Sequence, residues 1–230
     1  MNINGFFAWR ALMKRKQQHH WVRRILKDLL ITILLLIGLG LVFNSQLQSW
    51  WISHQSQQKV EKISHAEVKR GQQQRAEYKY ENVKAVSDDS FLESQKAKQT
   101  AAIGKISIPE LNIELPIFKG LNTQNLTIGA GTMKASQKMG QGNYTLAGHH
   151  MKDPNVLFSP LSRAKKGQMV TITNLKHDYR YQISQIKVVP ETDVSVLDDH
   201  PNQKLLTLVT CASGNPGETR RLIVTAKLIE

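Results

Sequence analysis

The sequence predicts a mainly β domain, built as a closed barrel or a sandwich, that follows an apolar anchor and a polar stretch. Three observations lead to this prediction. After residue 101, short apolar or alternating segments recur between turns that contain Gly or Pro, and long helical patterns are few. Before it lies an uncharged run at residues 29–43, and residues 52–100 are rich in Gln, Lys, Glu and Ser. The 230 residues suffice for one domain of ordinary size with appendages.

The N-terminal part has the features of a membrane anchor. The uncharged run is short for a span of roughly 20 residues, but extension to residues 25–51 reaches that length. Trp50 and Trp51 would then lie at the outer interface. Basic residues crowd the first 28 positions: Arg10, Lys14, Arg15, Lys16, Arg23, Arg24 and Lys27. The positive-inside rule therefore predicts a cytoplasmic segment at 1–24, a single-pass signal anchor at 25–51 and an extracellular remainder.

A cleaved secretory signal is the alternative to an anchor, and it would export the same domain. No small-x-small cleavage site follows Phe43, which favours the anchor. Residues 52–100 contain no proline and little apolar surface to offset their conformational entropy, unless parts of them form solvated helix. We predict an extracytoplasmic linker or stalk for them, followed by a β domain at 101–230.

The elements of the β domain are predicted from periodicity and from turn residues. Alternating segments at 103–108 and 111–118 each contain or precede a proline that interrupts pairing. Further strands are expected at 144–147, 169–173, 179–189, 205–211 and 222–228. One short helix is expected at 157–166, and there is no internal repeat.

Charge and cysteine content limit the possible functions. The formal net charge is +13, yet the basic residues after the N-terminal segment are scattered. The sequence has no zinc-finger spacing, RNA-binding aromatic signature or Walker loop, so a nucleic-acid partner is not expected. The single cysteine excludes an intrachain disulfide. A lone thiol on an exported domain is unusual and suggests a reactive role.

Three polar residues at the ends of predicted strands form a candidate site. Cys211 ends one strand, His149 follows another 62 residues earlier (211 − 149), and an arginine, Arg220 or Arg221, begins a third. A cysteine acts as a nucleophile in its thiolate form, a histidine can accept its proton, and an arginine can stabilise an oxyanion. Each residue also has a plainer explanation: inert packing, a turn and an edge charge. Without further information, a membrane-tethered β domain without catalytic activity therefore remains an alternative interpretation.

Motifs around these three residues resemble those of sortases, the cysteine transpeptidases of Gram-positive cell surfaces. TLVTC at 207–211 resembles the signature that ends on the family's cysteine. AGH at 147–149 and RLIV at 221–224 resemble its histidine segment and arginine strand, in the same order. The resemblance covers residues 101–230 and is strongest to the class A, housekeeping type. It implies an eight-stranded β-barrel with one or two short helices and no cofactor.

The resemblance also implies a reaction. Cys211 would attack the Thr–Gly carbonyl of an LPXTG-type sorting signal and form a thioacyl enzyme. An amine of the peptidoglycan precursor, of lipid II type, would then resolve it. His149 would serve as general acid and base, and the arginine would hold the oxyanion or the substrate backbone. LPXTG-bearing surface proteins, that amine and the lipid bilayer are the implied partners. A pilus-polymerising sortase is the alternative within the family.

Strand parity and family motifs address the remaining choices at the site. His149 follows Ala-Gly directly, and Arg221 shares the mixed face of its strand, so these two are preferred over His150 and Arg220. Candidate apolar groove walls for the sorting peptide are Ala147, Val194, Val196 and Val209. Some sortases bind calcium before the histidine strand, but residues 132–142 contain two lysines and no carboxylate here. We therefore expect no metal.

Overall fold

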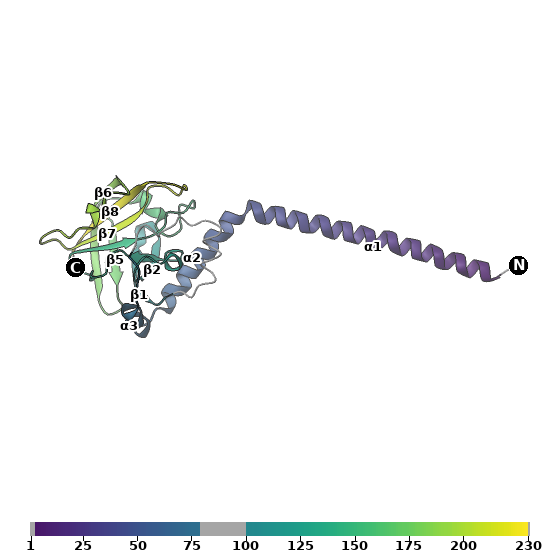
Figure 1. Cartoon of the computed structure of the whole chain (residues 1–230), viewed down its shortest axis with the longest axis horizontal. Helices are drawn as coiled ribbons and strands as arrows, with labels where there is room; N and C mark the ends of the chain where they lie inside the picture. The colour runs from purple at the N-terminus through teal and green to yellow at the C-terminus, as the bar shows by residue number, and fades with distance from the viewer. Residues whose placement is uncertain (1–2, 79–99, 230) are drawn as a thin grey trace. The chain divides into compact units, whose positions relative to one another are not determined.

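The computed structural model describes residues 3–78 and 100–229, and the chain divides into two compact units at residues 47 and 48. The first unit contains helix α1 (Ile3–Val42), drawn in purple in Figure 1. Within the described residues, no single helix has the length and hydropathy of a membrane span; only Arg23–Gly40 and Asn44–Lys62, bent by 63°, reach them as a pair. The anchor at 25–51 stays a prediction.

Two helices precede the barrel in the second unit, where a solvated stalk was expected. Helix α2 (Asn44–Lys62) places Ile52 in the main apolar core, and helix α3 (His65–Gln73) buries Val68. A Cβ at Gly71 would lie 2.7 Å from the Ala101 carbonyl oxygen, so glycine permits the close approach of α3 to the barrel. A few apolar residues on one helix face are enough for this packing, although the segment's average composition is polar. Residues 79–99 of the expected stalk lie outside the described residues.

Glu67 joins these helices to the first strand. Its carboxylate accepts a hydrogen bond from the Ala102 backbone N–H at 3.0 Å and pairs with Lys59 at 2.6 Å. Burial raises the pKa of Glu67, but the hydrogen bonds from Lys59 and Ala102 outweigh it and leave the pKa below its ordinary value. Residues 52–73 therefore pack against the barrel, where a polar stalk was expected.

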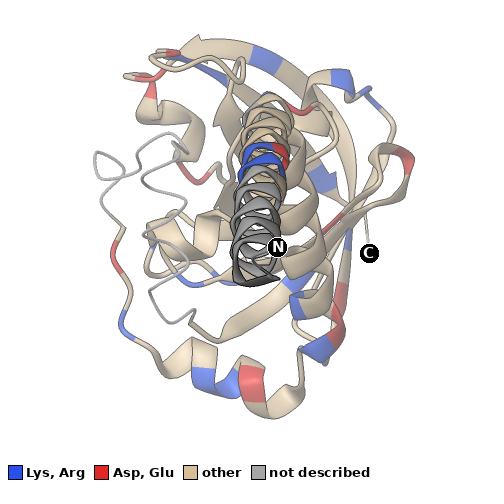
Figure 2. Cartoon of the chain, turned by 90° about the vertical axis from the view of Figure 1, so that its right-hand side faces the viewer, with Lys and Arg blue, Asp and Glu red and all other residues tan. Residues whose placement is uncertain are grey.

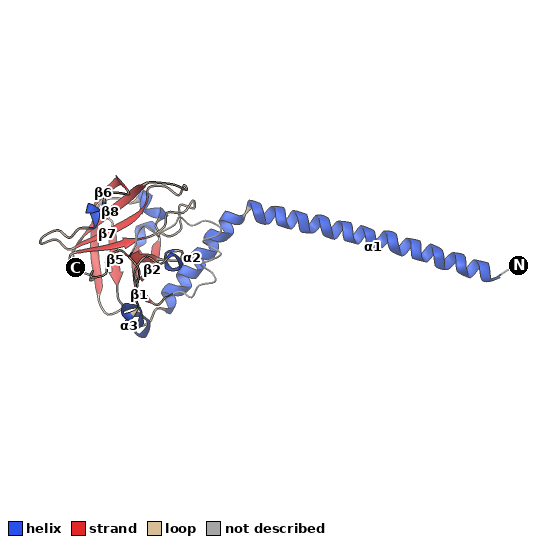
Figure 3. Ribbon diagram, in the orientation of Figure 1, coloured by secondary structure: helices blue, strands red, loops and turns tan. Residues whose placement is uncertain are grey.

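Eight strands close into a barrel in the order β1-β2-β3-β4-β7-β8-β6-β5. Figure 3 draws the strands in red. The strands are β1 (Ala102–Ile108), β2 (Ile113–Phe118), β3 (Ala130–Thr132), β4 (Asn143–Ala147), β5 (Met169–Thr173), β6 (Asp178–Pro190), β7 (Leu205–Cys211) and β8 (Arg220–Leu228). The β2–β3 and β4–β7 pairs are parallel, and the other six are antiparallel. The predicted eight-stranded barrel is confirmed.

Within residues 100–229, the helices that lie between the strands are short, as Figure 3 shows. They are η2 (Pro109–Leu111), α5 (Thr123–Leu126), η3 (Ser159–Arg163) and η4 (Val194–Leu197), of which the three η elements are 3₁₀ helices. The expected helix at 157–166 corresponds to η3. Strand β3 was not predicted, because three residues are too few to show a periodicity.

The two faces of the strands bury different apolar clusters. Inward-facing residues such as Leu146, Leu208 and Val224 fill the barrel and are fully buried. On the outer face a second cluster forms, and its members are Leu121, Leu126, Met133, Ala147, Val189, Val209 and Ile223, with Val196 and Leu197 of η4 packed against it. We call this set the outer apolar cluster. Alternation along β7 therefore places Val209 and Cys211 on the outside of the barrel.

Charged residues of the barrel domain are spread over many elements, as the colours in Figure 2 show. The blue Lys and Arg segments do not form one continuous stripe in that view. This arrangement agrees with the scattered basic residues in the sequence.

Candidate active site

A pocket of about 180 Å³ collects the three polar residues singled out in the sequence. Its lining includes His149, Cys211 and Arg221, which come from the end of β4, the end of β7 and the start of β8. Ala147 and Val209 line it as well, and both belong to the outer apolar cluster. The barrel thus joins segments that lie far apart in the chain at one place on its outer face.

Strand register decides which arginine reaches the cysteine. In the antiparallel β7–β8 pair, Cys211 is the direct partner of Arg221, and residues directly opposite each other point to the same face. Arg220 points to the other face, where its exposed guanidinium pairs with Glu218 at 3.0 Å. The pocket therefore contains Arg221 and does not contain Arg220.

The guanidinium of Arg221 is held in place by several acceptors. It donates to the Glu191 carboxylate at 2.6 Å and to the Glu218 backbone oxygen at 2.7 Å. Its side chain keeps only 13% of its surface exposed. A planar cation fixed in this way can stabilise a developing negative charge without first reorganising.

His149 lies just beyond β4 in a tight backbone environment. The Gly148 N–H donates to the Val209 carbonyl at 3.1 Å, which continues the pairing of β4 with β7. A Cβ at Gly148 would approach the Phe158 ring within 2.6 Å, so the residue before the histidine has to be glycine. His149 is 7% exposed, and its Nε2 has no hydrogen-bond partner among the described residues. Burial lowers the pKa of His149 to about 4.

The thiol of Cys211 is half-buried. Burial raises its pKa, and Glu218 and Glu191 raise it further, whereas Arg221 lowers it; the net direction is upward. Both members of the Cys211–His149 pair are therefore neutral in the resting site near pH 7. A proton has to leave the sulfur for the thiol to act as a nucleophile, and the neutral imidazole is able to accept it.

His150 makes a contact that sequence reasoning missed. Its Nδ1 lies 2.8 Å from the backbone oxygen of Cys211, and its backbone bridges to Leu157. The histidine pair was visible in the sequence, but no pattern there indicated a partner 61 residues away. The two rings have different surroundings, since only His149 lines the pocket.

The four predicted groove residues occupy different positions. Ala147 and Val209 line the pocket beside Cys211, and Leu126, which was not predicted, lines it too. Val196 packs against the outer apolar cluster from η4. Val194 is 66% exposed and does not line the pocket. The register of a four-residue 3₁₀ helix, which sequence does not predict, separates these two valines.

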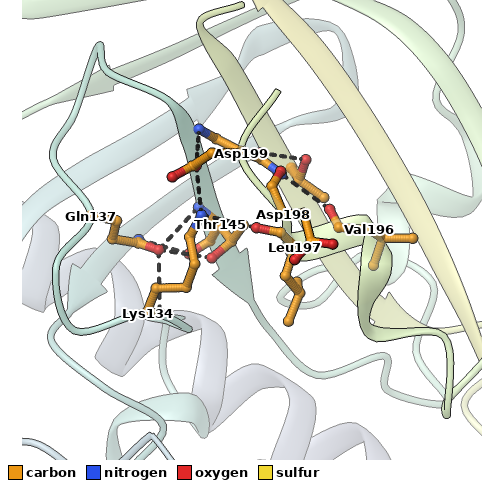
Figure 4. Close-up of polar contacts among 9 residues, drawn as sticks. Lys134, Gln137, Thr145, Val196, Leu197, Asp198 and Asp199 are labelled. Atoms are coloured by element: carbon orange, nitrogen blue, oxygen red, sulfur yellow. Dashed lines mark hydrogen bonds and ion pairs between the residues drawn. The ribbon is translucent and has the colours of Figure 1, made fainter. Parts of the chain in front are cut away.

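A polar network attaches the β6–β7 connection to the barrel wall, as Figure 4 shows. Lys134 Nζ donates to the Leu197 carbonyl at 2.9 Å and to the Asp199 carboxylate at 2.8 Å. Asn143 Nδ2 donates to the Val196 and Asp198 carbonyls, both at 3.0 Å. The hydrogen bond from Lys134 keeps the pKa of Asp199 below its ordinary value. These contacts hold η4 over the outer apolar cluster. The positive charge that pairs with Asp199 in this network is the Lys134 ammonium group.

Comparisons with known proteins agree with this geometry. The family model described as "Sortase domain" matches residues 106–229. Sortase A of Streptococcus agalactiae is 40% identical over 223 residues, which cover 94% of this chain and 90% of the relative. Sortase A of Listeria monocytogenes is 35% identical over 208 residues, covering 90% of this chain and 92% of the relative.

Solved structures show the same likeness. The structure of Listeria monocytogenes sortase A has a TM-score of 0.55 at 41% identity and covers 56% of this chain and 88% of that one. The pilus-related sortase C of Group B Streptococcus has a TM-score of 0.53 at 27% identity, covering 81% of this chain and 91% of that one. The identities favour the class A type. The chain belongs to the sortase family and is a class A-type cysteine transpeptidase.

Proposed function

We propose that this protein cleaves LPXTG-type sorting signals between Thr and Gly and transfers the surface protein to an amine of the peptidoglycan precursor. The observation that most supports this proposal is the pocket lined by Cys211, His149 and Arg221. In the β7–β8 pair, Cys211 and Arg221 are direct partners, so the thiol and the guanidinium are on the same face. The names of the relatives, sortase A in two Gram-positive genera, agree with the proposal.

In the first half-reaction, Cys211 Sγ attacks the Thr carbonyl carbon as its proton passes to His149. The negative charge on the carbonyl oxygen of the tetrahedral intermediate is stabilised by the Arg221 guanidinium. The intermediate collapses when the C–N bond breaks, and the imidazolium returns the proton to the leaving Gly amine. A thioester on Cys211 and a free C-terminal fragment result.

The second half-reaction reverses these steps with a new amine. His149, neutral again because of its burial, accepts a proton from the incoming ammonium or amine as the nitrogen attacks the thioester carbonyl. The C–S bond breaks, the His149 imidazolium returns its proton to the leaving Cys211 sulfur, and an amide to the cell-wall precursor remains. The same residue serves as acid and then as base, as microscopic reversibility requires.

The sorting peptide would lie along the outer apolar cluster. Ala147 and Val209 are proposed to form the floor beside the thiol, and Val196 the wall contributed by η4. Val194 is proposed to contact the peptide only at the outer rim, because its side chain is exposed. An extended apolar peptide gains affinity from such a groove, and its alternate side chains give specificity.

We also propose that residues 25–51 anchor the protein in the cell membrane, with residues 1–24 in the cytoplasm and the barrel outside. The described apolar side chains of α1 between Ile25 and Val42 are exposed. A helix that is apolar on all sides needs an apolar environment, and a bilayer supplies one. The basic residues before it favour a cytoplasmic N-terminus.

The direct test is intact mass spectrometry after incubation with an LPXTG-type peptide. The full chain in non-ionic detergent should gain the mass of the acyl part of the peptide, and proteolytic mapping should locate it on Cys211. A Cys211→Ala variant should gain nothing and release no C-terminal fragment. Release of the fragment by that variant at the wild-type rate would disprove the proposal.

A further inference from the structure

We propose that a second pocket, beside the active site, binds a phosphate-bearing anion. This pocket has a volume of about 500 Å³ and is lined by residues of β6, β7 and β8 and of the β6–β7 connection. Three of its lining residues are lysines: Lys166, Lys187 and Lys227. Of the described residues that line it, none is Asp or Glu. The inference goes beyond the proposed function, which assigns nothing to this pocket.

The fold brings these lysines together from separate elements. Lys227 and Lys187 lie on the outer face of β8 and β6, since Lys227 pairs with Leu205 and Lys187 pairs with Ile223. Lys166 belongs to the turn before β5, which is tied to β6 by the Gly167 N–H at 2.8 Å from the Ile183 oxygen. The convergence is therefore tertiary and is not a basic run in the sequence.

No carboxylate in the described part of the chain lies within ion-pair distance of these three ammonium groups. Elsewhere in the same domain, lysines do find partners: Lys105 pairs with Glu114 and Lys134 pairs with Asp199. Like charges that share a cavity repel each other, and an anion with several oxygens removes that repulsion. The charge of the pocket thus favours a ligand that carries more than one negative charge.

The other lining groups indicate the chemical class. Amide and hydroxyl groups that can donate to oxygens come from Gln185, Gln203 and Thr225. The hydroxyls of Ser184 and Ser195 also line the pocket, but they donate to the Thr225 carbonyl and to the Asp193 carboxylate. Among the described lining residues only Val196 and Leu205 are aliphatic, so an apolar peptide has little to contact. Lysine binds phosphate as a point charge, and hydroxyl or amide donors fill the remaining acceptor positions. A phosphate or pyrophosphate group fits this set of donors.

The pocket is connected to the active site through one loop. Asn143 and Val196 belong to its lining, and Asn143 Nδ2 holds the Val196 carbonyl at 3.0 Å. Val196 in turn packs on the outer apolar cluster. Along β7 the pocket ends at Thr207, four residues or about 13 Å from Cys211. A phosphate bound here is close enough to be part of the second substrate.

Two sources of the same chemistry are possible, a lipid-linked pyrophosphate and a free phosphate compound. Under the proposed function, the amine substrate is attached to a lipid-linked precursor. Only the lipid-linked source rests on the proposed function; the anion site itself does not. The experiment is calorimetric titration of the full chain, in non-ionic detergent at fixed ionic strength, with inorganic pyrophosphate. A second titration uses farnesyl pyrophosphate in the same detergent.

The variants separate a built site from general attraction to a basic protein. The double variant Lys187→Gln/Lys227→Gln should weaken pyrophosphate binding at least tenfold. The matched double variant Lys69→Gln/Lys176→Gln removes the same charge at exposed positions outside the pocket and should change it less than twofold. Equal weakening in both variants, or no saturable binding to the wild type, would overturn the inference.

The source follows from the ratio of the two affinities. Tighter, lysine-dependent binding of farnesyl pyrophosphate supports the lipid-linked source, and equal binding supports a soluble phosphate compound. Because the titration requires no turnover, its failure is distinguishable from failure of the proposed function, which is measured by acylation of Cys211. If the wild type does not bind pyrophosphate but is still acylated on Cys211 by the peptide, only the phosphate site is refuted.

Discussion

Lowering the pH from 7 to 4.5 should destabilise the protein, and a defined part of that loss should belong to His149. Burial depresses its pKa from 6.5 to about 4. The unfolded chain therefore takes up a proton below pH 6.5 that the folded protein refuses until about pH 4. The stabilisation due to the neutral imidazole is complete above pH 6.5 and is lost as the pH falls toward 4.

The magnitude follows from the two pKa values. Each pKa unit corresponds to about 1.36 kcal/mol, so a difference of about 2.5 units gives a full loss of about 3.4 kcal/mol. At pH 4.5, where the unfolded state is almost fully protonated and the folded state only partly, the loss is about 2.5 kcal/mol. That is a large share of the ~5–15 kcal/mol by which a typical domain is stable.

Urea denaturation of the full chain in non-ionic detergent measures this effect. The free energy of unfolding is determined at both pH values for the wild type and for His149→Gln, which cannot titrate. Other acidic and histidine groups contribute equally to both proteins, so the wild type should lose about 2.5 kcal/mol more than the variant. Parallel pH dependences would refute the reasoning. An NMR titration of the His149 ring gives an independent value: a pKa near 6.5 would show that the imidazole is solvated.

Three further predictions concern the arginine, the loop and the N-terminal helices. Arg221→Ala should lower kcat by about 10²–10³-fold, as for loss of an oxyanion donor, whereas Arg220→Ala should lower it by less than tenfold. Steady-state peptide cleavage gives the ranking, and the reverse order would invalidate the register argument. Calcium added at constant ionic strength should leave the rate unchanged, because Lys134 already pairs with the loop; a clear rise in rate would contradict this. Ile52→Ala should lower the free energy of unfolding, measured in urea, by about 2–5 kcal/mol. Val188→Ala, at an exposed position, is the control. Equal stability of the two variants would show that α2 is not part of the core.

Much of the fold could be predicted because its signals are local. The strands at 144–147, 169–173 and 205–211 appear in the sequence as β-branched or alternating runs between turns, and the structure places strands there. The motifs around Cys211 and His149 indicated the family. What failed was inference from average composition: residues 52–73 are polar overall, yet Ile52 and Val68 bury one side of two helices.

The sequence by itself determined which residue types are available: one thiol, a histidine after Ala-Gly and an arginine before an aliphatic run. Only the tertiary structure decided which of them share a pocket, because contacts between distant segments depend on strand order and register. The β7–β8 register places Arg221 opposite Cys211, and the parallel β4–β7 pair brings His149 to the same end. The same long-range pairing joins His150 to the Cys211 carbonyl and three lysines to one cavity. Side-chain alternation can be predicted from local sequence, but register is set by the whole barrel.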